Sequence, residues 1–198
     1  IQRLAASHPR SPWRLKALIS AGNRYLLVND AKNYLPLFTA AYESFPADPQ
    51  APYAHWKVAW HAYISRKPDA GEHMRRHLSM FSLHPSAGGA LYFLGRLAEE
   101  KRQWGDARAC YTRLAERFPH YYYGVLARER LANARVAGAK PGAAMTAFLE
   151  SVAFSEQPAG DGEQPTPATR ARLERVRLLQ TAGLDDLAAA EVRFGGDG

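Results

Sequence analysis

Three prolines, each preceded by an aromatic side chain, divide the first 119 residues of this chain at Phe45-Pro46, His84-Pro85 and Phe118-Pro119. Proline cannot continue a helix, because it lacks an amide hydrogen and its ring clashes with the preceding turn. The last two prolines lie 34 residues apart, and a helical pattern of apolar residues precedes each of them. This is the period of a two-helix unit of the tetratricopeptide type. The spacing therefore predicts a stack of helical hairpins.

The unit that ends at Pro119 fits this pattern best. Leu94, Gly95, Ala107 and Tyr111 stand at the positions where the two helices of such a repeat pack together. Because Gly95 has no side chain, we expect the second helix to approach the first closely at this point.

The preceding unit keeps the length but loses most of the pattern. It has Trp60 in the place of Leu94 and His77 in the place of Tyr111. Trp56 and Trp60 lie one helical turn apart, and we interpret them as core residues. The repeat is degenerate, so we describe it as tetratricopeptide-like.

The whole chain is expected to be all-α, because no segment alternates between apolar and polar residues long enough to form a strand. We predict tetratricopeptide-like hairpins stacked into a curved superhelix over residues 1–136. A loop, a short helix and a mobile linker should occupy residues 137–168, since residues 155–167 are rich in proline, glycine, glutamine and acidic residues. A closing helical hairpin, with Gly183 at its turn, follows over residues 169–198.

The composition limits the function only loosely. Lysine and arginine number 26 against 19 acidic residues, a net charge of +7 that favours a polyanionic partner. The arginines are spread over nearly every predicted helix, so they equally suit solvated helix faces, and no nucleic-acid recognition motif is present. No apolar run approaches the length of a membrane span. The single cysteine, Cys110, excludes an internal disulfide, and we expect a packed, unreactive thiol.

No catalytic, metal or cofactor site is evident. His73 and His77 have the spacing of two metal ligands on one helix, but no third ligand accompanies them, and we interpret them as part of a solvated face. The adjacent carboxylates Glu99 and Glu100 point in different directions on a helix and cannot face each other across a substrate. We therefore predict no catalytic residue, no bound metal and no cofactor.

The most distinctive candidate binding residues are three consecutive tyrosines, Tyr121, Tyr122 and Tyr123, followed by Arg128 and Arg130. On a helix three consecutive side chains spread over most of the circumference, so at least one tyrosine should face the core and one should face outward. An exposed tyrosine beside an arginine can stack on a sugar ring while the arginine pairs with a carboxylate. The alternative is that all three tyrosines pack between repeats.

Several of these segments together suggest a family. They are Leu94-Gly95-Arg96-Leu97, Gly105-Asp106-Ala107-Arg108, Tyr111, Phe118-Pro119 and Tyr121-Tyr122-Tyr123-Gly124-Val125-Leu126-Ala127-Arg128-Glu129-Arg130-Leu131. Over residues 88–132 the chain resembles the helical domain of soluble lytic murein transglycosylases. Residues 175–191 look like the segment that precedes the catalytic domain in that family.

The resemblance implies a periplasmic bacterial protein that acts on the cell wall. Such enzymes cleave the β-1,4 bond of peptidoglycan without water and leave a 1,6-anhydro sugar, using one glutamate in a lysozyme-like domain. The family's catalytic signature joins a Glu-Ser pair to a downstream Gly-Leu-Met-Gln. Glu150-Ser151 is followed by no such segment, so we expect the catalytic domain after Gly198 and no activity in this chain.

Two functions are therefore expected. The first is a monomeric, non-catalytic superhelical domain of a lytic transglycosylase that binds peptidoglycan glycan strands. The second is a tetratricopeptide-like scaffold of the cell envelope that binds another protein, because helical repeats commonly present grooves to peptides.

Overall fold

The computed structural model describes residues 1–154 and 166–193, and in this part of the chain every regular element is a helix. The predicted all-α class of stacked helical hairpins is confirmed. The chain divides into two compact units, Ile1–Glu156 and Gln157–Gly198. The predicted mobile linker falls mainly on residues 155–165, which lie outside the described residues.

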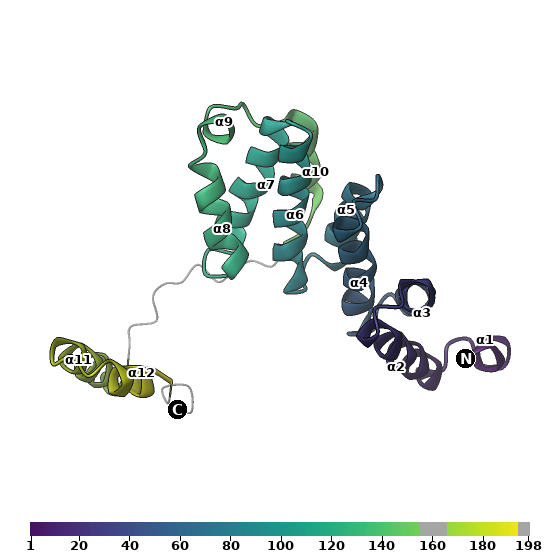
Figure 1. Ribbon diagram of the computed structural model, residues 1–198, viewed down its shortest axis with the longest axis horizontal. Coiled ribbons are helices and arrows are strands. Elements are labelled where there is room, and N and C mark those ends of the chain that lie inside the picture. The colour runs from purple at the N-terminus through teal and green to yellow at the C-terminus, as the bar shows by residue number, and fades with distance from the viewer. Residues whose placement is uncertain (155–165, 194–198) are drawn as a thin grey trace. The chain divides into compact units, whose positions relative to one another are not determined.

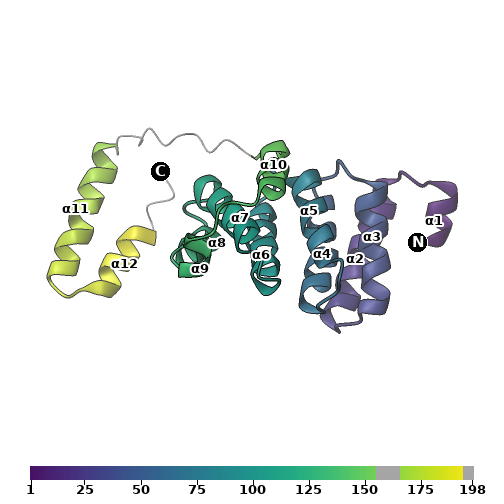
Figure 2. The same cartoon turned by 90° about the horizontal axis from the view of Figure 1, so that it is seen from above.

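The first unit contains α1 (Gln2–Ser7), α2 (Pro12–Leu27), α3 (Ala31–Ser44), α4 (Ala51–Ile64), α5 (Ala70–Phe81), α6 (Ser86–Glu100), α7 (Trp104–Arg117), α8 (Tyr122–Leu131), α9 (Ala134–Ala137) and α10 (Ala143–Ser151). Each helix from α2 to α8 packs against the next helix in the chain, and α10 packs on α7 (Figures 1 and 2). Helices α2 and α3, α4 and α5, and α6 and α7 form three hairpins. Contacts between α4 and α6, and between α6 and α8, place these three helices next to one another.

The same backbone turn joins the two helices of each hairpin. Asn29, Arg66 and Arg102 adopt left-handed conformations, with φ of 54°, 51° and 58°. In each turn the next residue donates its N–H to a carbonyl five residues earlier, as Lys67 does to Ala62 at 2.9 Å. This pattern closes a helix by satisfying its last carbonyl groups, and it most often uses glycine.

Close packing at Gly95 is confirmed. A Cβ atom built on Gly95 would lie 2.5 Å from Cε1 of Tyr111, so the ring occupies the space that any side chain would need. Tyr111 and Ala107 are fully buried, as the repeat pattern predicts.

The interior of the first unit forms two apolar clusters. One gathers buried side chains of α2, α3 and α4 together with Phe81 of α5, and the other extends from α4 to Phe154. Val58 belongs to the first cluster and its neighbour Ala59 to the second, so α4 contributes to both. Helix α10 packs on α7 through buried Met145 and Leu149, which ties residues 143–151 to the first unit.

The helix that follows Pro119 is shorter than its sequence suggests. The apolar pattern predicts one helix over residues 121–134, whereas α8 ends at Leu131. Asn133 then accepts a hydrogen bond from the Arg135 N–H at 3.0 Å and caps the short helix α9. The capping side chain of Asn133 therefore starts a new helix at a position where the apolar pattern predicts that the preceding helix continues.

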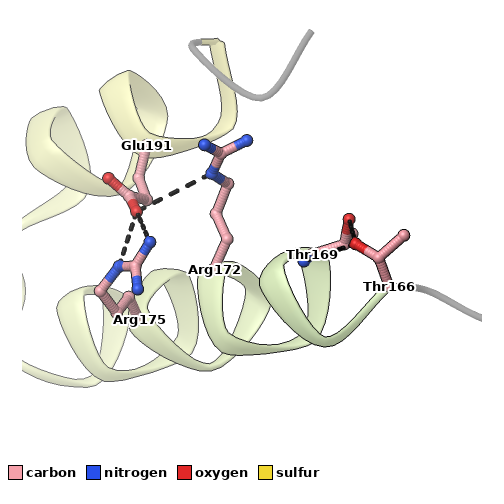
Figure 3. Close-up of polar contacts among 5 residues, drawn as sticks. All are labelled: Thr166, Thr169, Arg172, Arg175 and Glu191. Carbon is pink, nitrogen blue, oxygen red and sulfur yellow. Dashed lines mark hydrogen bonds and ion pairs between the residues drawn. The ribbon is translucent and has the colours of Figure 1, made fainter. Parts of the chain in front are cut away.

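The second unit is a hairpin of α11 (Pro167–Thr181) and α12 (Asp185–Arg193), which Figure 3 shows in part. Thr166 caps α11 by accepting a hydrogen bond from the Thr169 N–H at 3.2 Å. The two helices are joined by Arg175, whose guanidinium donates to Glu191 at 2.7 Å, and by the predicted glycine turn at Gly183, with φ of 71°.

Candidate functional site

Five half-buried aromatic rings line the neighbouring helices α4, α6 and α8. We call this group the aromatic strip, and its members are Trp56, Trp60, Tyr63, Phe93 and Tyr123. The three residues of α4 follow each other at intervals of four and three, so they share one face of that helix. The strip thus runs along α4 and crosses α6 to reach α8.

The rings of the strip form an unbroken series of contacts. Trp60 stacks on Trp56, with ring centroids 6.0 Å apart, and on Tyr63 at 5.5 Å. Phe93 lies 4.8 Å from Trp60 and 4.6 Å from Tyr63, and 5.5 Å from Tyr123 on its other side. Such contacts hold each ring in a defined orientation.

Gly89 on α6 makes room for this arrangement. A Cβ atom at Gly89 would lie 3.1 Å from Cη2 of Trp56 and 3.3 Å from Cε2 of Tyr123. Both contacts are tighter than ordinary van der Waals packing. The absence of a side chain on Gly89 therefore lets rings from α4 and α8 approach each other over α6.

A charged cluster adjoins the strip on α6 and α8. The Glu99 carboxylate, whose side chain is only 12% exposed, lies 3.3 Å from Nε of Arg96 and 3.6 Å from Nη1 of Arg130. Arg96 follows Phe93 by three residues, so the cluster continues the row of strip residues on α6. The two guanidinium groups and the single carboxylate leave this cluster with a net positive charge.

Two polar atoms of this region are buried: Nε of Arg96, whose partner is the Glu99 carboxylate at 3.3 Å, and the hydroxyl of Tyr111. Burial and the nearby Glu99 carboxylate raise the pKa of Tyr111. Both atoms lie inside the packing of α6 and α7, so they belong to the interior of the unit and not to its binding surface.

A shallow hollow of about 320 Å³ opens over the cluster. Its lining residues are Arg96, Glu99, Glu100, Trp104, Arg130, Asn133 and Arg135. The Arg135 guanidinium lies over the Trp104 ring at 5.5 Å. The hollow therefore combines three guanidinium groups with an aromatic face, a chemistry suited to carboxylates on a partly apolar ligand.

No protein-family model, curated protein or solved structure matches this chain. The site is thus interpreted from its own geometry. Within the described ranges, no helix is long and apolar enough to cross a membrane.

The structure separates the five candidate residues chosen from the sequence. Tyr123 belongs to the aromatic strip, Arg130 belongs to the charged cluster, and Tyr122 is 70% exposed with its ring 5.4 Å from that of Tyr123. Tyr121 packs edge-on against the Phe118 ring, and Arg128 donates a hydrogen bond to the Pro119 carbonyl at 2.9 Å. Tyr121 and Arg128 therefore stabilise the turn between α7 and α8.

Four strip residues were not among the candidates: Trp56, Trp60, Tyr63 and Phe93. The interpretation of Trp56 and Trp60 as core residues is only half right, because both are partly exposed. The intervals of four and three that place Trp56, Trp60 and Tyr63 on one face were a usable signal. This row stands out because three large aromatic residues share it.

The interpretation of His73 and His77 as a solvated face is wrong for His77, which is fully buried. Its Nδ1 lies 3.0 Å from Nδ1 of His55 on α4, and its Nε2 lies 2.7 Å from the Ser86 hydroxyl on α6. Burial lowers the pKa of both His55 and His77 to about 3. The two rings therefore share a hydrogen bond as neutral groups and link three helices.

The remaining candidate groups show no sign of chemistry. In residues 1–154 and 166–193, no three or more histidine, cysteine or acidic side chains are placed to hold a metal ion. Burial raises the pKa of Cys110 to about 12, which keeps it a thiol. A thiol that does not ionise is a poor nucleophile.

Proposed function

We propose that this chain is a non-catalytic helical-repeat domain that binds glycan strands of peptidoglycan, and that it serves as the superhelical scaffold of a periplasmic lytic transglycosylase. The observation that carries the proposal is the aromatic strip, with the charged cluster of Arg96, Glu99 and Arg130 beside it. The sequence resemblance to the helical domain of that family supports the same function.

The strip suits a linear glycan for a physical reason. A sugar ring has one face rich in C–H groups, and this face packs favourably on a flat aromatic ring that remains partly open to solvent. Trp56, Trp60 and Tyr63 are partly exposed along one face of a helix, so a linear glycan that lies on this face can contact successive rings. The tight ring contacts hold these platforms in place before the ligand arrives, which lowers the entropic cost of binding.

The charged cluster supplies the polar part of recognition. Arg96 and Arg130 converge on one carboxylate, Glu99, so the two guanidinium groups carry one more positive charge than this carboxylate neutralises. Carboxylates of the glycan's lactyl or peptide groups can accept from these donors.

The site supports binding without catalysis. Glu99 and Glu100, the acidic residues that line the hollow over the charged cluster, are adjacent on α6 and cannot take positions on opposite sides of a glycosidic bond. Glu99 is also already paired with two arginines.

One observation favours a second function, that of a protein-binding scaffold. Leu27 and Val28, at the end of α2, are 88% and 72% exposed. Adjacent apolar side chains in solvent are typical of surfaces that another protein covers. In this case the ligand would be an envelope protein.

The test is a binding titration with β-1,4-linked N-acetylglucosamine oligomers and with soluble peptidoglycan strands. We expect wild-type chain to bind both and the Trp60→Ala variant to lose most of this affinity. Trp13→Ala is the matched control, because Trp13 is 70% exposed on α2 and lies outside the strip. Equal binding by W60A and wild type, with both folded by circular dichroism, would contradict the proposal, and no binding by wild type would favour the protein scaffold.

A further inference from the structure

Two arginines occupy backbone positions that do not suit them. Arg66 and Arg102 close α4 and α6 with left-handed φ angles of 51° and 58°. The matching positions in the other hairpins hold Asn29 and Gly183, the two residue types that tolerate this conformation best. Strain at a non-glycine residue is a reason to ask what its side chain does.

The fold itself makes no use of these two side chains. Both are exposed, and within the described ranges neither guanidinium has a hydrogen bond or an ion pair. A glycine would form the same turn with less strain. The charge of Arg66 and Arg102 therefore has no role in folding that the structure reveals.

The two turns lie at the same edge of the stack and are strongly basic. Each arginine has a lysine beside it in sequence, Lys67 and Lys101 respectively. Arg66, Lys67 and Lys101 line one hollow of about 530 Å³, and among the described residues Glu100 is the only carboxylate that lines it. We call these four cations, Arg66, Lys67, Lys101 and Arg102, the basic edge.

The basic edge continues the aromatic strip. Tyr63, the last strip residue on α4, precedes Arg66 by three residues. Glu100 lines both the hollow of the basic edge and the hollow over the charged cluster. The two hollows therefore adjoin at the end of α6. A glycan strand that lies on the aromatic strip reaches the basic edge where it passes the C-terminus of α4.

We infer that the basic edge binds carboxylate groups of an acidic glycan whose sugar rings lie on the aromatic strip. This inference rests on the proposed function. Guanidinium groups pair with carboxylates through two parallel hydrogen bonds, and lysines add point charges that attract a polyanion from a distance. Four cations on two neighbouring turns match a polymer that repeats its charge along the chain better than they match a single small anion.

The test replaces both arginines by glycine, the residue that the turn favours. We expect R66G/R102G to unfold at the same temperature as wild type or higher. Its affinity for soluble peptidoglycan strands should fall by about tenfold or more, the loss equivalent to one charge-assisted hydrogen bond. Its affinity for neutral N-acetylglucosamine oligomers should not change. The loss should shrink at high salt, because exposed charges are screened.

Two further variants serve as controls. Asn29→Gly changes the same turn in the first hairpin without removing charge, and it should leave both affinities intact. R66N/R102N removes the charges with a residue that Asn29 shows to be acceptable in this turn, and it should reproduce the loss seen in R66G/R102G.

Unchanged affinity of R66G/R102G and R66N/R102N for peptidoglycan strands would overturn the inference while leaving the aromatic strip as a glycan site. Equal losses for strands and for neutral oligomers would also overturn it, because charge would then not be the cause. Failure of the proposed function has a different signature, since W60A would then bind neutral oligomers as well as wild type does.

Discussion

The ring of Tyr111 takes the place of a side chain at Gly95: an added Cβ atom would lie 2.5 Å from Tyr111 Cε1 and 2.9 Å from Cζ. This contact joins α6 to α7 inside the unit that fits the tetratricopeptide-type pattern best. Tyr111 is itself fully buried, so the ring cannot swing into solvent to relieve a clash.

Replacement of Gly95 by alanine should therefore destabilise the first unit, by about 1–3 kcal/mol as is usual for overpacking of a core. The measurement is the free energy of unfolding in urea. Gly71→Ala on α5 is the matched control, because its nearest contact would be Leu97 Cδ1 at 4.0 Å. G71A should be neutral or slightly stabilising, since alanine favours a helix more than glycine does. A G95A chain as stable as wild type would refute this packing.

Stability should fall in mild acid because of His55 and His77. Burial lowers the pKa of both to about 3 in the folded chain, whereas an unfolded histidine titrates near 6.5. Between these values the unfolded chain binds more protons than the folded chain. The contribution of each neutral histidine is complete above about pH 6.5, and it declines by up to about 1.4 kcal/mol per pH unit as the pH falls toward 3.

Urea unfolding at several pH values between 4.5 and 7.5, a range chosen around the unfolded pKa of about 6.5, measures this slope. Replacing the exposed His120 by glutamine should leave the slope intact. Replacing His77 by glutamine should reduce it. A stability that does not depend on pH in wild type would show that the two rings are not buried as neutral groups.

The three consecutive tyrosines should differ in their effect on stability. Tyr123 packs on Tyr92 and Phe93, with ring centroids at 5.3 Å and 5.5 Å, so Tyr123→Ala should cost about 1–3 kcal/mol through lost packing. Tyr122 is 70% exposed, and Tyr122→Ala should stay within about 0.5 kcal/mol of wild type. Thermal unfolding of the two variants checks this, and equal losses would mean that Tyr122 is packed as well.

Much of the fold could be predicted because its signals are local. Pro46 and Pro119 follow the ends of α3 and α7 by two residues, and Pro85 lies directly before α6. Gly95 and Tyr111, which pack together, are also close in sequence. The packing of α10 on α7 had no such local signal. Its apolar residues, such as Met145 and Leu149, suggested only a short helix, and tertiary contacts decide where a short helix docks.

The candidate site was harder to predict for a related reason. Periodicity shows which residues share a face of one helix, but not how much of that face the neighbouring helices cover. Trp60 occupies the same repeat position as Leu94 in the next unit. Leu94 is buried, whereas Trp60 is only half-buried and belongs to the aromatic strip. The pairing of His55 with His77 across two helices has no counterpart in the spacing of either residue alone.

The most direct test of the central claim is tryptophan fluorescence in a chain that carries Trp13→Phe and Trp104→Phe. Of the four tryptophans, only Trp56 and Trp60 of the aromatic strip then remain to report. The account predicts a saturable change in their emission when N-acetylglucosamine oligomers are added, and its loss when Gly89→Leu crowds the space between Trp56 and Tyr123. An unchanged spectrum at saturating peptidoglycan strands would contradict a glycan site on the aromatic strip.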